Sequence, residues 1–224
     1  MNIEDIIIYE DRSVIVVRKP AGIAVQSASF GQKDLESMLK TRLFEKEGKA
    51  APYLGIVHRL DQPVQGLVVF AKDPKSCASL STQIQSGKMC KEYLAVVCGQ
   101  AKEQDELVHF LKKDPRTNLS QTAEKGDKNA KKALLSYRLL EQREDLALIR
   151  ISLKTGRHHQ IRVQMKAAGL PLYGDQKYNP MAQKGEMIAL CAAHLEFEHP
   201  GTGKRMRFDC EGTGGAFDRM AQPG

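Results

Sequence analysis

The 224-residue sequence lacks the features that mark several classes of protein. No apolar run approaches the roughly 18 residues of a membrane-spanning helix, and acidic residues interrupt the first short apolar runs, so we expect neither a membrane span nor a secretory signal. Five cysteines without a Cys-x-x-Cys pair are typical of reduced core thiols. No P-loop or Gly-x-Gly-x-x-Gly follows a strand, which argues against nucleotide-driven reactions. These absences predict a cytoplasmic protein.

Positive charge is in moderate excess and unevenly distributed. The 34 basic and 27 acidic side chains leave a net charge of +7. An excess of this size occurs both in proteins that bind polyanions and in proteins that do not. The region from 112 to 132 has little apolar content, and it is either a solvated loop or a surface for phosphates. Its cations are Lys112, Lys113, Arg116, Lys125, Lys128, Lys131 and Lys132.

The hydrophobic pattern alternates between short strands and a few helices. Apolar residues recur at helical spacing over 33–47, with Gly48 placed to end that helix. Asp73-Pro74 is a typical helix start, and a second helix should end before Gly87. A third helix is predicted over 157–168, closed by Gly169 and Pro171. The predicted strands are 6–9 paired with 14–17, 91–99, 133–140 paired with 146–153, 187–191, 194–198 and 205–209.

No repeat, linker or change of composition divides the chain. We therefore expect residues 1–224 to form a single α+β domain with a mostly antiparallel mixed sheet and flanking helices.

A carboxylate, Asp61, follows His58 and Arg59 between the apolar runs 54–57 and 67–71. Burying an unpaired charge costs several kcal/mol or more, so an Asp between two strands needs a cation, hydrogen-bond donors or a chemical task. The competing interpretation is an ordinary surface turn, because Pro and Gly follow closely. The pattern alone favours neither interpretation.

A second group of polar residues opens the predicted helix at Thr155-Gly156. At spacing i, i+4, His158 and Arg162 would share a helix face, beside first-turn N–H groups that suit an anion. The tandem histidines could suggest a metal, but neighbours on a helix point about 100° apart and no third ligand accompanies them. We therefore expect no metal site, and imidazoles that face solvent or phosphate.

Tyr93 lies on the predicted strand 91–99, between alternating apolar neighbours. A tyrosine in this position is usually part of the core. Its role therefore depends on the context of the surrounding motif.

Four motifs in order resemble those of the RluA-like family of RNA pseudouridine synthases. They are Lys19-Pro20-x-Gly22, Val57-His58-Arg59-Leu60-Asp61 with Gly66-Leu67-Val68-Val69-Phe70-Ala71-Lys72, Lys91-x-Tyr93-x-Ala95-x-Val97-x-Gly99, and Thr155-Gly156-Arg157 through Arg162 with Gly169 through Tyr178. The chain departs from the commonest family form in having Val64-Gln65 where Thr-Ser precedes the glycine. From the resemblance we expect the chain to begin directly with the catalytic domain, without the small RNA-binding module that many relatives carry.

The resemblance implies the pseudouridine synthase fold with a central catalytic cleft, an isomerase activity on uridines in ribosomal or transfer RNA, and no cofactor. It implies that Asp61 is the essential residue, that Tyr93 belongs to the active site, and that Arg162 pairs with the catalytic Asp. Asp61 would act either as a nucleophile or as an electrostatic partner. We expect a monomer. The predicted RNA contacts are His58, Arg59, Lys91, Lys125, Lys128, Lys131, Lys132, Arg157, His158, His159 and Gln160.

Two other functions compete with this one. A non-catalytic RNA-binding protein on the same scaffold would not require the chemistry of Asp61. A metal nuclease would need a cluster of carboxylates or histidines at motif spacing, and the sequence has none.

Overall fold

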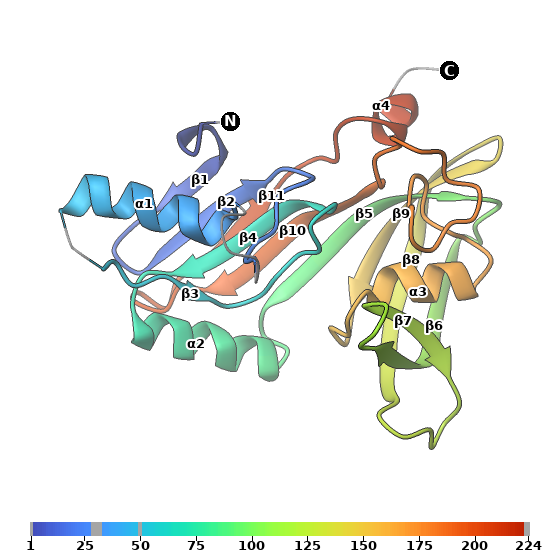
Figure 1. Cartoon of the computed structure of the whole chain (residues 1–224), viewed down its shortest axis with the longest axis horizontal. Helices are drawn as coiled ribbons and strands as arrows, with labels where there is room; N and C mark the ends of the chain where they lie inside the picture. The colour runs from blue at the N-terminus through green and yellow to red at the C-terminus, as the bar shows by residue number, and fades with distance from the viewer. Residues whose placement is uncertain (1, 28–32, 49–50, 222–224) are drawn as a thin grey trace. The chain divides into compact units, whose positions relative to one another are not determined.

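A computed structural model describes residues 2–27, 33–48 and 51–221. The chain divides into two compact units (Figure 1). Unit 1 comprises Met1–Lys91 and Cys191–Glu211, and unit 2 comprises Glu92–Leu190 and Gly212–Gly224. That all 224 residues act as one catalytic domain stays a prediction.

The sheet of unit 1 has the strand order β1-β2-β4-β10, with β11 on β10 and β3 on β4. Neighbouring strands are antiparallel except for β4 and β10, whose parallel pairing brings Gln65 opposite Cys191. The strand bounds are β1 Ile7–Glu10, β2 Val14–Lys19, β3 Gly55–Ile56, β4 Gln65–Ala71, β10 Leu190–Glu198 and β11 Arg205–Asp209. Strand β10 joins two of the predicted strands, since the small residues Ala192 and Ala193 continue it.

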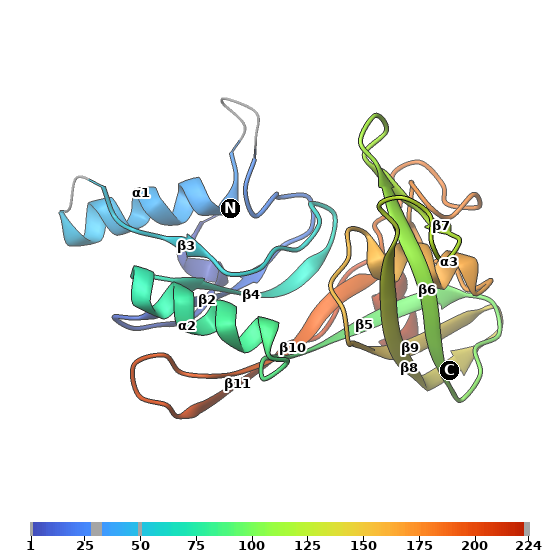
Figure 2. The ribbon, with the colours of Figure 1, turned by 90° about the horizontal axis from the view of Figure 1, so that it is seen from below.

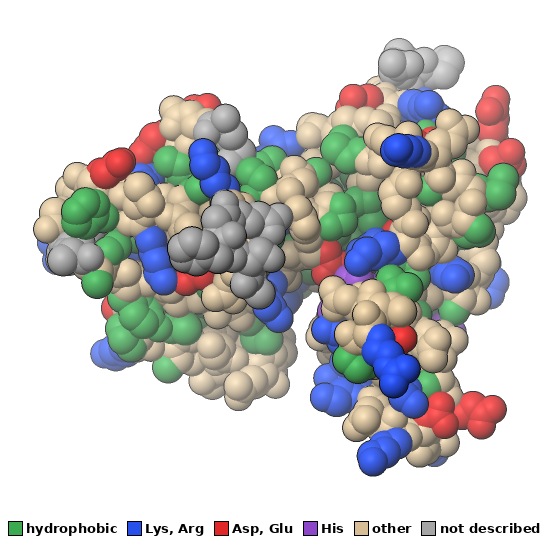
Figure 3. Space-filling view, in the orientation of Figure 1, with side chains coloured by type: hydrophobic (Ala, Val, Ile, Leu, Met, Phe, Trp, Pro, Cys, Tyr) green, Lys and Arg blue, Asp and Glu red, His purple; other side chains and the backbone are tan. Residues whose placement is uncertain are grey.

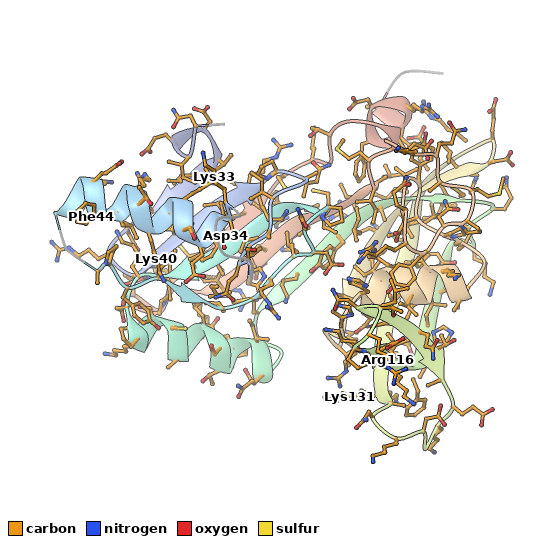
Figure 4. The ribbon with its side chains drawn as sticks, viewed as in Figure 1. Lys33, Asp34, Lys40, Phe44, Arg116 and Lys131 are labelled. Atoms are coloured by element: carbon orange, nitrogen blue, oxygen red, sulfur yellow. The ribbon has the colours of Figure 1, made fainter. Side chains whose placement is uncertain are left out.

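The helices of unit 1 begin and end where their capping residues predict. Helix α1 (Leu35–Glu47) is capped by the Asp34 carboxylate, which accepts from Ser37 N–H, and ends at left-handed Gly48. Helix α2 (Pro74–Gln85) starts at Asp73, whose carboxylate accepts from Ser76 N–H. A short 3₁₀ turn, Glu4–Ile6, precedes β1. Figure 4 labels Asp34 and Lys40 at α1.

Both faces of the sheet in unit 1 are covered. One face packs against Leu80 of α2 and forms a core with Val14, Val16, Leu67, Val69, Leu195 and Phe197. The alternate residues of β2 and β4, such as Ile15 and Phe70, are buried as well. Because both sets of side chains are buried, β4 reads as a continuous apolar run in the sequence.

The sheet of unit 2 is antiparallel, with the order β5-β9-β8-β6-β7. The strands are β5 Cys90–Cys98, β6 Gln104–Asp114, β7 Leu119–Ala123, β8 Lys131–Arg143 and β9 Leu146–Leu153. Strands β6 and β7 cover much of the basic region that the sequence left open as a solvated loop or a surface for phosphates. Only Leu107 and Leu111 of β6 are buried, so the strand shows little hydrophobic alternation.

Helix α3 (Gln160–Ala167) lies beside β6 and β7 (Figure 2). Its Val163 packs with Leu111, Ala133 and Tyr178. The prediction that this helix begins at 157 is wrong, because His159 has a left-handed backbone with φ 53° and ends the preceding loop. His158 therefore lies outside α3 and does not share a helix face with Arg162. A last helix, α4, spans Ala216–Ala221.

The predicted α+β class with a mostly antiparallel mixed sheet and flanking helices is confirmed by the elements of the two units. Among the described residues, no helix is long and apolar enough to cross a membrane.

Candidate active site

Asp61 lies in the loop of unit 1 between β3 and β4 and is half-buried. Its backbone carbonyl accepts from Val64 N–H at 3.0 Å, which closes a turn just before β4. Asp61 therefore lies just before a strand that is buried along its whole length.

The loop of Asp61 is fastened to the Lys19-Pro20 turn. Gly22 N–H donates to the carbonyl of Gln62 at 2.9 Å, and the Gln62 amide donates back to the Gly22 carbonyl at 3.0 Å. The fully buried Lys19 ammonium donates to the carbonyls of Pro20, Ile23 and Gln62 at 2.9, 2.7 and 3.1 Å. Burial lowers the pKa of Lys19 to about 8, and the charge of Asp61 opposes that shift.

The Val64-Gln65 departure fits the interior of unit 1. Val64 is 2% exposed and Gln65 is 6% exposed, so neither residue presents its side chain to a ligand from the surface. The following Gly66 has φ +122°, and a Cβ there would lie 2.4 Å from backbone atoms of Ala192. The close approach of β4 to β10 therefore requires glycine at this position.

His58, predicted to contact RNA, directs its ring against β4. Val69 N–H donates to His58 Nε2 at 3.3 Å, and Nδ1 is buried with no partner within the described part of the chain. Burial, followed by the charge of Lys91, lowers the pKa of His58 to about 3. A charged imidazole for a phosphate is therefore not available at neutral pH. Arg59 is exposed, and burial lowers the pKa of the half-buried Lys91.

Arg162, in the first turn of α3, is held by a carboxylate that the sequence left without a role. Its Nε and Nη2 atoms donate to the two oxygens of Asp175 at 2.9 and 2.6 Å. The side chains of both residues are at least 96% buried, since their exposures are 4% and 0%. A bidentate pair fixes the plane of the guanidinium as well as its position.

Tyr178 extends this arrangement toward the histidines. The Arg162 guanidinium lies over the Tyr178 ring, 5.0 Å from its centroid. The Tyr178 hydroxyl accepts from Ser120 N–H at 2.8 Å and lies 2.7 Å from His159 Nδ1. His158 stacks on His159 with ring centroids 3.8 Å apart, and its Nδ1 lies 2.9 Å from Ser120 Oγ.

The predicted RNA contact Gln160 has a structural task in the loop before α3. Its Oε1 accepts from Arg157 N–H at 2.9 Å and from the Thr155 hydroxyl at 2.8 Å, while its Nε2 donates to the carbonyl of Leu134. Gln160 and His159 are both buried, so an RNA contact by either one requires the loop to open. Arg157 is exposed and donates to the carbonyl of Lys132 at 3.0 Å.

Tyr93 is 7% exposed on β5, paired with Ile151 of β9. The structure thus places Tyr93 and Arg162 in unit 2 and Asp61 in unit 1. Their joint action as catalytic residues stays a prediction.

The remaining predicted RNA contacts are exposed cations of unit 2. Lys125 and Lys128 lie in the loop after β7, and Lys131 and Lys132 open β8. Blue side chains gather over the β6–β7 end of this unit in Figure 3, and Figure 4 labels Arg116 and Lys131 there. Among the described residues, no group of three or more His, Cys, Asp or Glu side chains could hold a metal ion.

Comparisons with known proteins show the family to which the chain belongs. Residues 13–167 match the family model for RNA pseudouridylate synthase. The chain is 35% identical over 209 residues to the RNA pseudouridine synthase YlyB of Bacillus subtilis, covering 91% of this chain and 67% of that protein. It is 34% identical to the ribosomal large subunit pseudouridine synthase D of Zymomonas mobilis, covering 92% and 68%. The chain therefore belongs to the RNA pseudouridine synthases, in the RluA-like family.

Further relatives and solved structures extend this result. The ribosomal large subunit pseudouridine synthase C of Escherichia coli K12 is 34% identical, covering 92% of this chain and 66% of that protein. The chain thus spans about two thirds of the length of these relatives. The structure of human RNA pseudouridylate synthase domain containing 4 superposes with a TM-score of 0.78 at 20% identity, covering 94% of this chain and 90% of that one. This likeness confirms the predicted pseudouridine synthase fold.

Three residues of the site lie within the family motifs, but the sequence predicted no function for them. They are Lys19, Asp175 and Tyr178. Their partners are distant in the chain: Lys19 bonds to Gln62, and Tyr178 bonds to Ser120. Membership of a motif was the only signal that could have identified them.

Proposed function

We propose that this RNA pseudouridine synthase modifies uridines of ribosomal large-subunit RNA, with Asp61 as its essential residue. The similarity to the C and D synthases supports the choice of RNA. Transfer RNA is the alternative substrate. The observation that carries the role of Asp61 is the fastening of its loop by Lys19 and by the two-way bonding of Gly22 and Gln62.

The reaction breaks the bond from ribose C1′ to uracil N1 and forms a bond from C1′ to C5. The hydrogen at C5 leaves to solvent and N1 regains a proton, so atoms balance without an oxidant or an energy source. Asp61 acts at C1′, either as a nucleophile or as the partner of a positively charged sugar. Both routes need an ionised carboxylate, and neither calls for a cofactor.

Arg162 and Tyr93 complete the proposed catalytic set. A guanidinium held rigidly by Asp175 offers a fixed cation for the carboxylate of Asp61. The ring of Tyr93 would stack on the uracil. The target base has to leave its helical stack to reach these groups, which costs a few kcal/mol.

Binding energy comes from phosphates of the RNA. The exposed Lys125, Lys128, Lys131 and Lys132 are the proposed contacts in unit 2, and Arg59 is the proposed contact in unit 1. We further propose that the protein acts in the cytoplasm as a monomer.

The substrate is tested by release of the uracil C5 hydrogen from labelled transcripts. Large-subunit rRNA and a pool of tRNAs are compared at equal uridine concentration. We expect release from the rRNA transcript at a few sites. Release from tRNA alone would contradict the choice of RNA, and RNA binding without release from either substrate would support the non-catalytic alternative.

A further inference from the structure

A pocket of about 420 Å³ lies within unit 2, between the β6–β7 hairpin and helix α3. Its volume falls in the range of roughly 300–1,000 Å³ that is typical of small-ligand sites. Val163 and Tyr178 form its buried floor. The pocket borders the candidate site through Ser120 and Tyr178, but none of its lining residues is a predicted catalytic residue or a predicted RNA contact.

The rim of the pocket is basic. Lys166 of α3 and Lys177 line it, and both are exposed. Neither lysine has an ion-pair partner in the described part of the chain. The acidic residue of the lining, Asp114, uses its carboxylate locally, because it accepts from Arg116 N–H at 2.8 Å and from the Thr117 hydroxyl at 3.1 Å. The lining therefore carries two ammonium groups and one carboxylate, and its positive charge is in excess.

Polar but uncharged groups complete the lining. Thr117, Gln121 and Thr122 belong to the β6–β7 hairpin and are exposed at the pocket. Hydroxyl and amide side chains together with lysines are the usual protein groups at RNA phosphates and sugars. An apolar floor below such a rim suits the flat face of a base or the edge of a ribose.

The pocket shares a segment with Arg162. The backbone N–H groups of Lys177 and Tyr178 donate to Asp175 Oδ1 at 3.0 and 3.3 Å, and the same carboxylate holds Arg162. An occupant that contacts Lys177 thus lies next to the segment that fixes the proposed catalytic cation. This proximity favours a part of the substrate over an unrelated ligand.

We propose that this pocket binds one nucleotide of the RNA substrate outside the target uridine, with its phosphate between Lys166 and Lys177. The proposal rests on the proposed function and adds a specificity-determining contact to it. The phosphate contributes affinity, and the limited volume favours a nucleotide that is single-stranded at this point.

The charge of the pocket is tested with the double variant Lys166→Gln/Lys177→Gln. The matched control is Lys75→Gln/Lys184→Gln, which removes the same charge at two exposed positions away from the pocket. Affinity for a single-stranded uridine-containing RNA is measured over a range of salt. We expect a Kd at least tenfold higher than that of the control at low salt, and a log-log salt slope shallower by about 0.7 for each phosphate that the variant no longer neutralises.

The space in the pocket is tested without a change of charge. Ala167 belongs to the lining, and Ala167→Trp would fill the pocket, whereas Ala78→Trp at an exposed position of α2 is the control. We expect Ala167→Trp to raise KM for RNA at least fivefold and to leave kcat within twofold. Unfolding curves of both variants serve to check that the fold is retained.

Equal binding by the pocket variants and their controls would overturn the proposal. The proposal would also be overturned if the lysine variant bound RNA as well as its control does but bound a polyglutamate peptide more weakly than the control. Wild-type release of the uracil C5 hydrogen reports separately on the proposed function. If the wild type releases hydrogen and the pocket variants bind RNA as their controls do, the pocket proposal alone is rejected. If the pocket variants bind RNA more weakly but the wild type releases no hydrogen, the enzymatic role alone is rejected.

Discussion

Arg162 and Asp175 form a buried bidentate ion pair, with N–O distances of 2.9 and 2.6 Å. The pair sits under Tyr178, so the guanidinium is constrained by a carboxylate at its edge and a ring at its face. A cation fixed in this way can act on a second carboxylate without reorganising. Asp175 is therefore a positioning residue for the proposed catalytic set.

Replacement of Asp175 should leave the buried guanidinium of Arg162 without a counter-charge. We expect Asp175→Ala to lower the free energy of unfolding by about 3–5 kcal/mol, measured with urea. Asp105→Ala is the control, because its ion pair with Lys102 lies at the surface, where solvent screens the two charges. A decrease no larger than that of the control would show that Asp175 does not stabilise Arg162.

The buried Lys19 should make stability depend on pH in the alkaline range. Burial lowers the pKa of Lys19 to about 8, below the 10.5 of the unfolded chain. The unfolded state therefore binds more protons between these values, and wild-type stability should rise across pH 8–10.5 by up to about 3 kcal/mol relative to Lys19→Met. Parallel stability curves for the two proteins would contradict the burial of a charged Lys19.

His58 should have its effect in acid. Its folded pKa of about 3 lies below the 6.5 of the unfolded chain, so the stability that it contributes is complete above pH 6.5 and is lost as the pH falls toward 3. We expect thermal unfolding of the wild type to shift to lower temperature over this interval more steeply than that of His58→Gln. An equal shift would indicate a solvated, protonated ring.

Gly66 should not tolerate a side chain. Its φ of +122° and the 2.4 Å approach of a Cβ to Ala192 predict that Gly66→Ala costs about 2–3 kcal/mol of stability. Gly156→Ala is the matched control, since nothing lies within 4 Å of its Cβ position. The measurement is the midpoint of chemical unfolding, and similar midpoints for the two variants would contradict the close strand approach.

Local signals in the sequence were sufficient for the elements that depend on local chemistry. Gly48 ends α1, and Asp73 with Pro74 begins α2, as their capping preferences predicted. Strands β6 and β7 were missed because few of their side chains are buried and these give no alternating pattern.

The start of α3 and the partners of the site depend on contacts that spacing does not reveal. The left-handed His159 is stabilised in a loop whose shape depends on Gln160 and its bonds to Thr155 and Arg157. Arg162 could be recognised within its motif, but its pairing with Asp175 required the fold. Long-range hydrogen bonds of this kind have no signature in hydrophobic periodicity.

The role of Asp61 is tested most directly by release of the uracil C5 hydrogen from large-subunit rRNA by Asp61→Asn. The exposed Asp5→Asn is the control, and filter binding shows whether each variant still binds the RNA. We expect Asp61→Asn to bind RNA within threefold of the wild type and to release hydrogen at least about 1,000-fold more slowly. Release at the wild-type rate by Asp61→Asn would contradict the account.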